Sequence, residues 1–496
     1  MHIRTFFLPE KRILPKESVA ARPKLKIGQK SASSDGFPDT RTMSQAKELN
    51  LLEGSLWDKM IIIALPLAFT GVLQQLFNAA DVAVLGHYVS SDAMAAVGNN
   101  VPVIGLIVSL CMGLALGVNV VTARYLGMRQ KELASESVHT AFALSVAFGV
   151  AIALLGEIFC GFIMDVLDVP ESVLGHAEDY LRVYLAGIPF IAVYNFLASV
   201  FRSKGDTKTP LWALCAATVF NIAGNLFFVL VCGMQAGGVA LATALANALA
   251  AAILVVCLMR RNDELRLIPA RLFTVNRTAL KNMVRIGWPA GLQSMVFSLS
   301  NLIIQAAINS LGPDAMAGSV AAFTIEINVY CFINAFGLTA TTFVSQNWGA
   351  GNLARCRRAT LISMGLNFAA TFVLVAFIWI FARELLACFT TDESVIALGL
   401  TRIFWVVLPE PVNVIMETLS DAMRGFGYSL PPAVVTLVCI CSIRVLWVAT
   451  LFAADPTYNM LMAVYPASWV VTTLMLWWLY RRHQKTLETK TAGSFD

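Results

Sequence analysis

Long apolar blocks separated by short polar connections run through most of the chain, and their length predicts its architecture. Blocks of roughly 20–28 residues are long enough to cross about 30 Å of hydrocarbon as helices. Because lipid offers the backbone no hydrogen-bond partners, such blocks predict helices that satisfy their own polar groups. About twelve membrane-spanning helices are expected, near residues 60–86, 94–122, 137–164, 178–200, 209–232, 237–259, 286–309, 315–344, 359–382, 397–422, 431–453 and 458–480.

The apolar pattern occurs twice. Asp92-Ala93-Met94-Ala95 recurs as Asp314-Ala315-Met316-Ala317. The two motifs are 222 residues apart (314 − 92), and this spacing is the repeat offset. At that offset or one residue more, the matched pairs include Gly127 and Gly349, Pro189 and Pro411, Arg202 and Arg424, Pro66 and Pro289, and Asn78 and Asn301. Each copy holds six blocks, so both copies begin and end on one side of the membrane. The predicted fold is an all-α membrane protein of two parallel six-helix repeats, forming two lobes around a central cavity.

Breaks in the apolar pattern give the predicted domain boundaries. The longest internal polar stretch falls between the two copies and predicts a linker, which includes a short amphipathic helix near 279–285. The expected organisation is a disordered basic cytoplasmic tail over 1–54, an N-lobe over 55–260, a cytoplasmic linker over 261–285, a C-lobe over 286–482 and a cytoplasmic tail over 483–496.

Composition and charge agree with a membrane protein. Hydrophobic residues make up 57% of the chain and charged residues 14%, and the mean hydropathy is +0.70. The net charge of +5 comes from Lys and Arg in alternate connections, which stay in the cytoplasm, so both termini are expected there. The expected setting is a bacterial inner membrane, crossed many times by a monomer. Its expected partners are the lipid bilayer and small-molecule substrates, and no nucleic acid.

Sequence motifs of enzymes and pumps are missing. The chain has no GxxxxGK[ST] phosphate-binding loop and no HExxH, so an ATP-driven pump and a membrane-embedded enzyme are both disfavoured. The ten cysteines are scattered through apolar blocks without a CxxC pair and are interpreted as small apolar side chains.

Polar residues inside the N-lobe blocks are candidates for function, because a carboxylate at the bilayer centre costs at least about 2.5–3.5 kcal/mol. Asp81 lies in the first block, with Asn78 one turn earlier. Asn221 and Asn225 are four residues apart and therefore share a helix face. An acid surrounded by amide and hydroxyl oxygens can hold a proton or a Na⁺ ion. Two further candidates are Asn195 and Thr243.

The C-lobe carries its acids in different blocks. Glu326 and Asn328 lie inside the eighth block, and Glu410, Glu417 and Asp421 form one stripe along the tenth. Glu326 and Glu417 are the stronger candidates for contacting a cationic substrate, whereas Asp421 is expected to pair with Arg424. The intramembrane Arg444 is expected to have a carboxylate partner, either Glu417 or Asp421.

These features together resemble the multidrug and toxic compound extrusion (MATE) family. The resemblance rests on the proline-containing first span ending in Asp81, the Asp-Ala-Met-Ala motif, the two Arg-x-x-Gly-x-x-x-x-Pro loops and the twelve spans in two halves. It implies two six-helix lobes around a cavity, and export of cationic or amphipathic compounds driven by inward Na⁺ or H⁺.

The resemblance also assigns residues. Asp81 matches the first-span acid of cation coupling, Asn221 an asparagine of the N-lobe site and Thr243 its threonine. Asn225 stands where many members have a second aspartate. Phe297-Ser298 stand where the NorM branch has a glutamate, so the chain looks nearer the DinF-like branch.

The predicted function is therefore a secondary antiporter that exports small amphipathic, cationic compounds by alternating access. The coupling site would be Asp81, Asn221, Asn225 and Thr243, with H⁺ favoured over Na⁺ because only one carboxylate is present. The substrate cavity would include Asn78, Asn195, Glu326, Asn328 and Glu417. No cofactor is expected, and no metal beyond a possible Na⁺ at Asp81. The alternative is a lipid-linked precursor flippase of the same superfamily.

Overall fold

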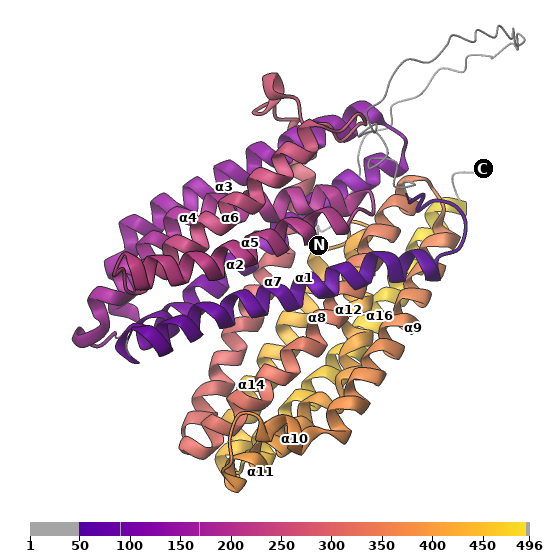
Figure 1. The fold of residues 1–496 in the computed structure, drawn as a ribbon. Helices are drawn as coiled ribbons and strands as arrows, with labels where there is room; N and C mark the ends of the chain where they lie inside the picture. The colour runs from indigo at the N-terminus through magenta and orange to yellow at the C-terminus, as the bar shows by residue number, and fades with distance from the viewer. Residues whose placement is uncertain (1–48, 90, 168, 493–496) are drawn as a thin grey trace, which may run out of the picture. The chain divides into compact units, whose positions relative to one another are not determined.

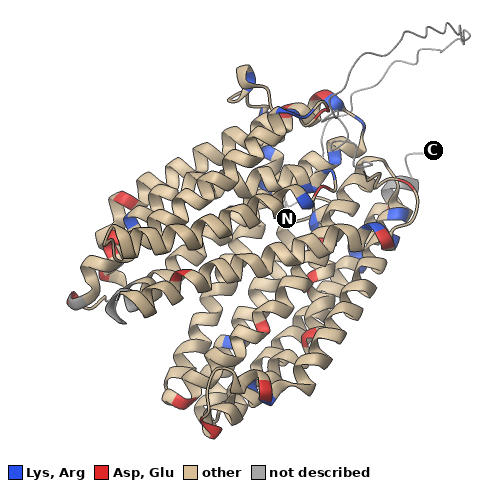
Figure 2. Cartoon of the chain, in the orientation of Figure 1, with Lys and Arg blue, Asp and Glu red and all other residues tan. Residues whose placement is uncertain are grey.

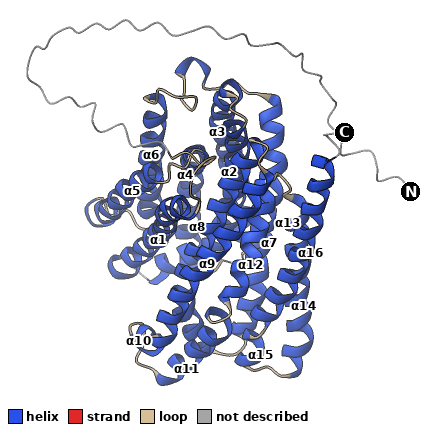
Figure 3. Ribbon diagram, turned by 90° about the vertical axis from the view of Figure 1, so that its right-hand side faces the viewer, coloured by secondary structure: helices blue, strands red, loops and turns tan. Residues whose placement is uncertain are grey.

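The computed structural model describes residues 49–492 except 90 and 168. The predicted disordered tail therefore lies outside the described residues over 1–48, as does the end of the C-terminal tail. Helices account for the regular structure, and no strand occurs in the described part of the chain (Figure 3). The all-α prediction is confirmed.

The first six long helices form the N-lobe, drawn in indigo to magenta in Figure 1. Their bounds are α1 Trp57–Tyr88, α2 Ser91–Gly127, α3 Lys131–Val166, α4 Glu171–Ser203, α5 Lys208–Leu226 with the π-helical segment η2 Phe227–Val231, and α6 Ala236–Met259. The 3₁₀ turn η3 (Pro269–Arg271) belongs to the connection that follows.

The remaining helices form the C-lobe, in salmon, orange and yellow in Figure 1. They are α7 Arg277–Asn309, α8 Pro313–Gly349, α9 Leu353–Ile380, α10 Ala382–Ala387, α11 Glu393–Arg402 with η4 Ile403–Val407, α12 Glu410–Gly425, α13 Leu430–Thr436 with η5 Leu437–Cys441, α14 Ser442–Trp447 with η6 Val448–Phe452, α15 Tyr458–Met462 and α16 Val464–Ala492.

The number of spans agrees with the sequence prediction. Eleven helices or helix runs in the described residues are long and apolar enough to cross a membrane, and a bent pair brings the number to twelve. That pair is Glu393–Val407 and Glu410–Gly425, which meet at an angle of 41°. Pro409 lies at the break and has no amide hydrogen for the helical ladder.

Two predicted boundaries differ in detail from the structure. Helix α7 begins at Arg277, so the expected amphipathic segment near 279–285 is the start of this long helix. Residues 49–54 are part of the fold, because Leu51 is buried and its carbonyl oxygen accepts a hydrogen bond from Asn347 Nδ2. The chain therefore packs onto α8 before α1 begins.

Contacts between the lobes follow the sequence repeat. Helix α1 packs on α8, and its counterpart α7 packs on α2. The α2–α7 crossing is close, because a Cβ added at Gly113 would lie 2.1 Å from the backbone nitrogen of Gly291. Only glycine permits backbones to approach so closely, as in GxxxG contacts between membrane helices.

A second, reciprocal contact joins α2 and α8 where both helices end. A Cβ on Gly127 would lie 2.0 Å from the Gln346 carbonyl oxygen, and one on Gly349 would lie 2.3 Å from that of Arg124. Gly127 matches Gly349 and Arg124 matches Gln346 at the repeat offset. Arg129 follows α2 and Arg355 lies in the first turn of α9, so this contact between the lobes lies at a basic end of the helices.

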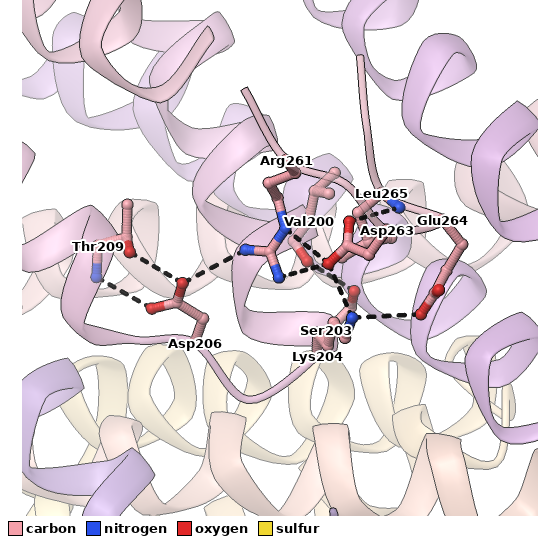
Figure 4. A network of polar contacts seen from close by, with 9 residues as sticks. All are labelled: Val200, Ser203, Lys204, Asp206, Thr209, Arg261, Asp263, Glu264 and Leu265. Atoms are coloured by element: carbon pink, nitrogen blue, oxygen red, sulfur yellow. Dashed lines mark hydrogen bonds and ion pairs between the residues drawn. The ribbon is translucent and has the colours of Figure 1, made fainter. Parts of the chain in front are cut away.

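Most Lys and Arg residues gather at the end of the helices where α16 ends, and the middle portions of the helices are nearly free of charge (Figure 2). At this basic end of the N-lobe, an ion-pair network ties the α4–α5 loop to the segment after α6 (Figure 4). Lys204 Nζ lies 2.8 Å from Asp263 Oδ2, and Arg261 Nη2 lies 2.7 Å from the same atom. Burial raises the pKa of Asp263, but hydrogen bonds and charge from Arg261 and Lys204 outweigh it and hold that pKa at about 2.

Candidate coupling and substrate sites

A buried polar cluster surrounds Asp81 within the N-lobe. The Asp81 side chain is 5% exposed although it belongs to a membrane-spanning helix. Its Oδ1 accepts a hydrogen bond from Asn225 Nδ2 at 2.7 Å, and its Oδ2 accepts one from Thr243 Oγ1 at 2.8 Å. Asn221 Nδ2 donates to Thr243 Oγ1 at 3.1 Å. The structure thus brings all four predicted coupling residues together from α1, α5 and α6.

The chemistry of this cluster suits an exchangeable charge. Each carboxylate oxygen of Asp81 receives one donor, which stabilises the ionised form in apolar surroundings. Asn225 Oδ1 is buried and has no hydrogen-bond partner within the described structure. The π-helical segment η2 begins two residues after Asn225, and such segments are frequent at functional sites.

A cavity of about 690 Å³ lies between residues of both lobes. The volume is within the range of about 300–1,000 Å³ typical of small-molecule sites. Its wall comes mainly from α2 and α4 of the N-lobe and from α7, α8 and α12 of the C-lobe. Near the basic end the wall includes Arg202 and Arg424, and towards the opposite end it includes Ile308 and Ser319. The cavity therefore runs from the region of Arg202 and Arg424 towards Ile308 and Ser319.

Charged side chains of the cavity fall into two groups. Four form ion pairs: Arg402 Nε lies 2.9 Å from Glu326 Oε2, and Arg424 pairs with Asp421. Three others make no ion pair with a described residue. Glu410 accepts a hydrogen bond from Asn413 Nδ2 at 2.8 Å, and Arg202 Nη2 donates to Ser199 Oγ at 2.6 Å. The third is Glu417, which lines the cavity without a hydrogen bond to any described side chain.

The predicted cavity residues are only partly brought together. Asn195, Glu326 and Glu417 line the cavity, whereas Asn78 and Asn328 do not. Asn78 is rotated by about 60° from Asp81 around α1 and is exposed. Asn328 is two residues from Glu326, hence nearly opposite on α8, and its amide donates to Thr324 O at 2.8 Å. These two predictions are corrected.

Two predictions about buried charges have opposite outcomes. The Asp421–Arg424 pair is present, as expected. The predicted carboxylate partner of Arg444 is wrong, because no described carboxylate lies within ion-pair distance of its fully buried side chain. Arg444 Nη1 instead donates to Asn301 Oδ1 at 2.6 Å, and its guanidinium carbon lies 4.7 Å from the ring centre of Tyr465. The side-chain oxygen of Asn301 and the ring of Tyr465 thus take the place of the expected carboxylate.

Sequence reasoning missed the buried Arg402. Its 4% exposure, its ion pair with Glu326 and its hydrogen bond to Ser319 Oγ at 2.7 Å make it part of the cavity wall. An arginine within the tenth apolar block was a detectable signal. It changes the interpretation of Glu326, which is already neutralised by a neighbour and is less available to a cationic substrate.

Comparison with known proteins identifies the fold and the repeat. The family model MatE matches the chain twice, over residues 66–227 and 289–449. The chain belongs to the MATE family. The two matches lie in the N-lobe and the C-lobe, so each lobe is one copy of the family's repeating unit. Members of this family are transporters and not enzymes.

Curated relatives of the chain carry transporter names. It is 26% identical to the probable multidrug resistance protein YoeA of Bacillus subtilis, over 86% of this chain and 94% of YoeA. It is 27% identical to the probable multidrug resistance protein NorM of Thermotoga maritima, over 78% and 83%. A relative in Shewanella oneidensis named FAD transporter is 24% identical over 90% and 96%. The chain is therefore a multi-pass membrane transporter in a family known for multidrug efflux.

Solved structures confirm the architecture. A MATE crystallised in complex with MaL6 superimposes with a TM-score of 0.83 at 22% identity, over 90% of this chain and all of that one. The outward-facing conformation of a multidrug resistance MATE family transporter superimposes with a TM-score of 0.80 at 23% identity, over 90% and 99%. The two-lobe fold is common to all of them.

Proposed function

We propose that the chain is a secondary active antiporter that exports small amphipathic, mainly cationic, compounds by alternating access. The observation that carries this proposal is the separation of two polar sites. Two glutamates that form no ion pair with a described residue line a cavity between the lobes, and a single buried carboxylate lies in its own cluster inside the N-lobe. An exchanger needs both a substrate site and a coupling site whose charge can change.

Glu410 and Glu417 are the substrate-binding acids in this proposal. They lie on one helix, seven residues apart, which corresponds to about 10 Å along the axis. A cationic group in a low-dielectric cavity is attracted strongly by such carboxylates. Asn195 adds a neutral polar group on the opposite lobe. The names of the relatives YoeA and NorM support efflux of many compounds rather than uptake of a single nutrient.

The proposed coupling ion is H⁺ rather than Na⁺. Asp81 is the only carboxylate among the described residues of its cluster. A proton neutralises Asp81 completely. Na⁺ would share the site with a single compensating charge and mostly neutral ligands, which favours weak binding.

The proposed setting is a bacterial inner membrane, with both termini in the cytoplasm. The Lys and Arg residues of the basic end support this orientation through the preference of basic loops for the cytoplasm. In this orientation the close contact between α2 and α8 at Gly127 and Gly349 lies on the cytoplasmic side. One chain contains both lobes and the whole cavity wall, so a monomer is a sufficient transport unit.

The decisive experiment reconstitutes the protein in proteoliposomes and imposes H⁺ and Na⁺ gradients separately. Export of a cationic dye should continue when choline replaces Na⁺ and should stop when a protonophore collapses the pH gradient. Transport that follows a Na⁺ gradient at clamped pH would reverse the choice of ion. Absence of dye movement under either gradient would refute the antiporter.

A further inference from the structure

Arg444 is a fully buried cation inside a membrane-spanning segment. It is 0% exposed and belongs to the apolar span Leu430–Phe452. Its guanidinium carbon lies near two aromatic rings, 5.0 Å from the ring centre of Phe297 and 4.7 Å from that of Tyr465. A charge in such surroundings is costly unless other groups compensate it. The remaining contacts of this guanidinium therefore decide what it can bind.

The hydrogen bonds of Arg444 use only one side of its guanidinium. Nη1 donates to Asn301 Oδ1 at 2.6 Å, whereas the buried Nε and Nη2 have no partner in the described structure. Nε and Nη2 form one edge of the planar group, from which two N–H donors point in the same direction. Such an edge is the part of an arginine that binds an anion in bidentate geometry. One complete anion-binding edge is therefore left unused by the described side chains.

The charges around Arg444 leave it without a counterion among the described residues. Glu326 and Arg402 both act on it electrostatically, with opposite signs. Glu326 Oε2 lies 2.9 Å from Arg402 Nε, so the charges of this pair largely cancel. Tyr465 lies beside both arginines, because the Arg402 guanidinium carbon is 5.6 Å from its ring centre. The two guanidinium groups beside Tyr465 thus share one carboxylate, which leaves an excess of one positive charge.

Another unused donor lies next to the same tyrosine. The ring centre of Trp469 is 6.0 Å from that of Tyr465, and the buried Nε1 of Trp469 has no hydrogen-bond partner in the described structure. An indole, like a guanidinium, can only donate. The matching ligand brings negative charge and accepts hydrogen bonds. A buried water molecule would supply the acceptors but would leave the charge of Arg444 uncompensated.

We propose that the Nε–Nη2 edge of Arg444 binds a small monovalent inorganic anion such as chloride. The size of the ligand follows from the position of the site. Arg444 is fully buried and does not itself line the cavity between the lobes, so the site suits an ion rather than an organic compound. A single negative charge matches the excess of one positive charge. The anion is a resident counterion inside the C-lobe, and its binding does not depend on what the transporter exports.

The test measures thermal unfolding of the purified full-length protein while chloride replaces gluconate at constant sodium concentration and pH. A ligand that binds only the folded state raises the unfolding temperature as its concentration increases. Chloride should raise the unfolding temperature of the unaltered protein by on the order of a few degrees. Bromide and nitrate should act similarly, because they are also small monovalent anions. Broadening of the chlorine NMR signal by the protein measures binding directly.

Two substitutions remove the need for the anion in different ways. Arg444→Met removes the buried charge, whereas Asn301→Asp keeps the arginine and supplies a carboxylate of the same shape where Asn301 Oδ1 accepts its hydrogen bond. In both variants the unfolding temperature should no longer depend on chloride, and the NMR broadening should be lost. Asn78→Asp is the matched control, because Asn78 is the repeat counterpart of Asn301 and lies exposed on α1 of the other lobe. This variant should retain the full chloride dependence.

A chloride dependence that disappears in Arg444→Met and Asn301→Asp but persists in Asn78→Asp would support the site. The proposal would be overturned if chloride, bromide and nitrate all left the unaltered protein unchanged, or if chloride stabilised Arg444→Met and Asn301→Asp as much as the unaltered protein. Stabilisation by acetate alone would assign the edge to an organic carboxylate and would also overturn it. Should Arg444→Met fail to fold, Asn301→Asp decides the question, because it retains the arginine.

Discussion

The same corner of the two lobes holds a buried acid in one and a buried arginine in the other. In the N-lobe, Asp81 on α1 meets Asn225 and Thr243. In the C-lobe, Arg444 meets Asn301 on α7 and Tyr465. Asn301 is the repeat counterpart of Asn78, and Tyr465 corresponds to Thr243 at the repeat offset. The charges themselves lie on helices that are not counterparts, Asp81 on α1 and Arg444 on α14, so the duplicated scaffold holds opposite charges in the same corner but at positions that do not match.

The difference indicates which lobe can couple to an ion. A carboxylate can be neutralised by a proton or by Na⁺, so its lobe can pass through a neutral state. Arginine remains protonated in proteins and cannot exchange its charge. Arg444 is also fully buried and held by a carbonyl acceptor and an aromatic face. We therefore expect ion-driven rearrangement to begin in the N-lobe, with the Arg444 cluster serving as a fixed element.

The largest expected effect in this comparison comes from Asp81→Asn, which removes the exchangeable charge and preserves the side-chain shape. Gradient-driven dye export in proteoliposomes should be abolished, while the amount of folded protein stays near normal. Asn78→Ala is the matched control, because Asn78 is exposed on the same helix and should leave export nearly unchanged. Retained drug resistance in cells carrying Asp81→Asn would rule out the role given to Asp81.

A smaller effect is expected from the substrate wall of the C-lobe. Glu417→Gln should weaken binding of a cationic dye about tenfold, because a charge-assisted contact is lost, and should affect a neutral dye much less. Dye binding to the purified variants measures this directly. Asn328→Ala is the control, since Asn328 does not line the cavity. Equal losses for the two dyes would indicate structural damage.

Arg444→Met should leave coupling intact if the C-lobe cluster is a fixed element. Replacing a buried charge by an apolar residue of similar volume is often neutral or stabilising, although the acceptor on Asn301 loses its donor. We expect dye export within about threefold of the unaltered protein, because the apolar replacement preserves packing. If Arg444→Met binds dye normally but its export no longer depends on the proton gradient, then the C-lobe takes part in coupling. That result would contradict the assignment of coupling to Asp81 alone.

The smallest effect concerns the basic ends of the two lobes. Lys204 and Asp206 correspond to Phe426 and Tyr428 at the repeat offset, so ion pairs in the N-lobe are replaced by aromatic contacts in the C-lobe. Tyr428, for example, stacks on His483 with ring centres 4.3 Å apart.

As the pH is lowered, the α4–α5 loop of the N-lobe should therefore lose its contacts before the α12–α13 loop of the C-lobe does. The pKa of Asp263 is depressed from its ordinary value of 3.8 to about 2 in the folded protein. Its ion pairs therefore contribute fully to stability at pH values above 3.8, and this contribution is lost as the pH falls through about 2. Hydrogen exchange of residues near 204–209 and 426–432 at decreasing pH measures the difference. Asp263→Asn should remove the pH dependence of the first segment, and simultaneous loosening of both segments would contradict it.

Much of the fold could be predicted from the sequence. Block length, the repeat and the alternation of basic connections predicted the helices, the two lobes and the number of spans, because lipid leaves the backbone few alternatives. The spacing of Asn221 and Asn225 placed both on one helix face. These are local or pairwise properties, which periodicity can reveal.

The tertiary structure decided the partners of the buried charges. Periodicity could not show that Arg444 would meet Asn301 and Tyr465, that Glu326 would be neutralised by Arg402, or that Asn78 would be exposed. Each of these outcomes depends on how helices distant in sequence rotate against one another. A helix sequence specifies which side chains share a face, but the neighbour that the face meets is set by packing across the whole bundle.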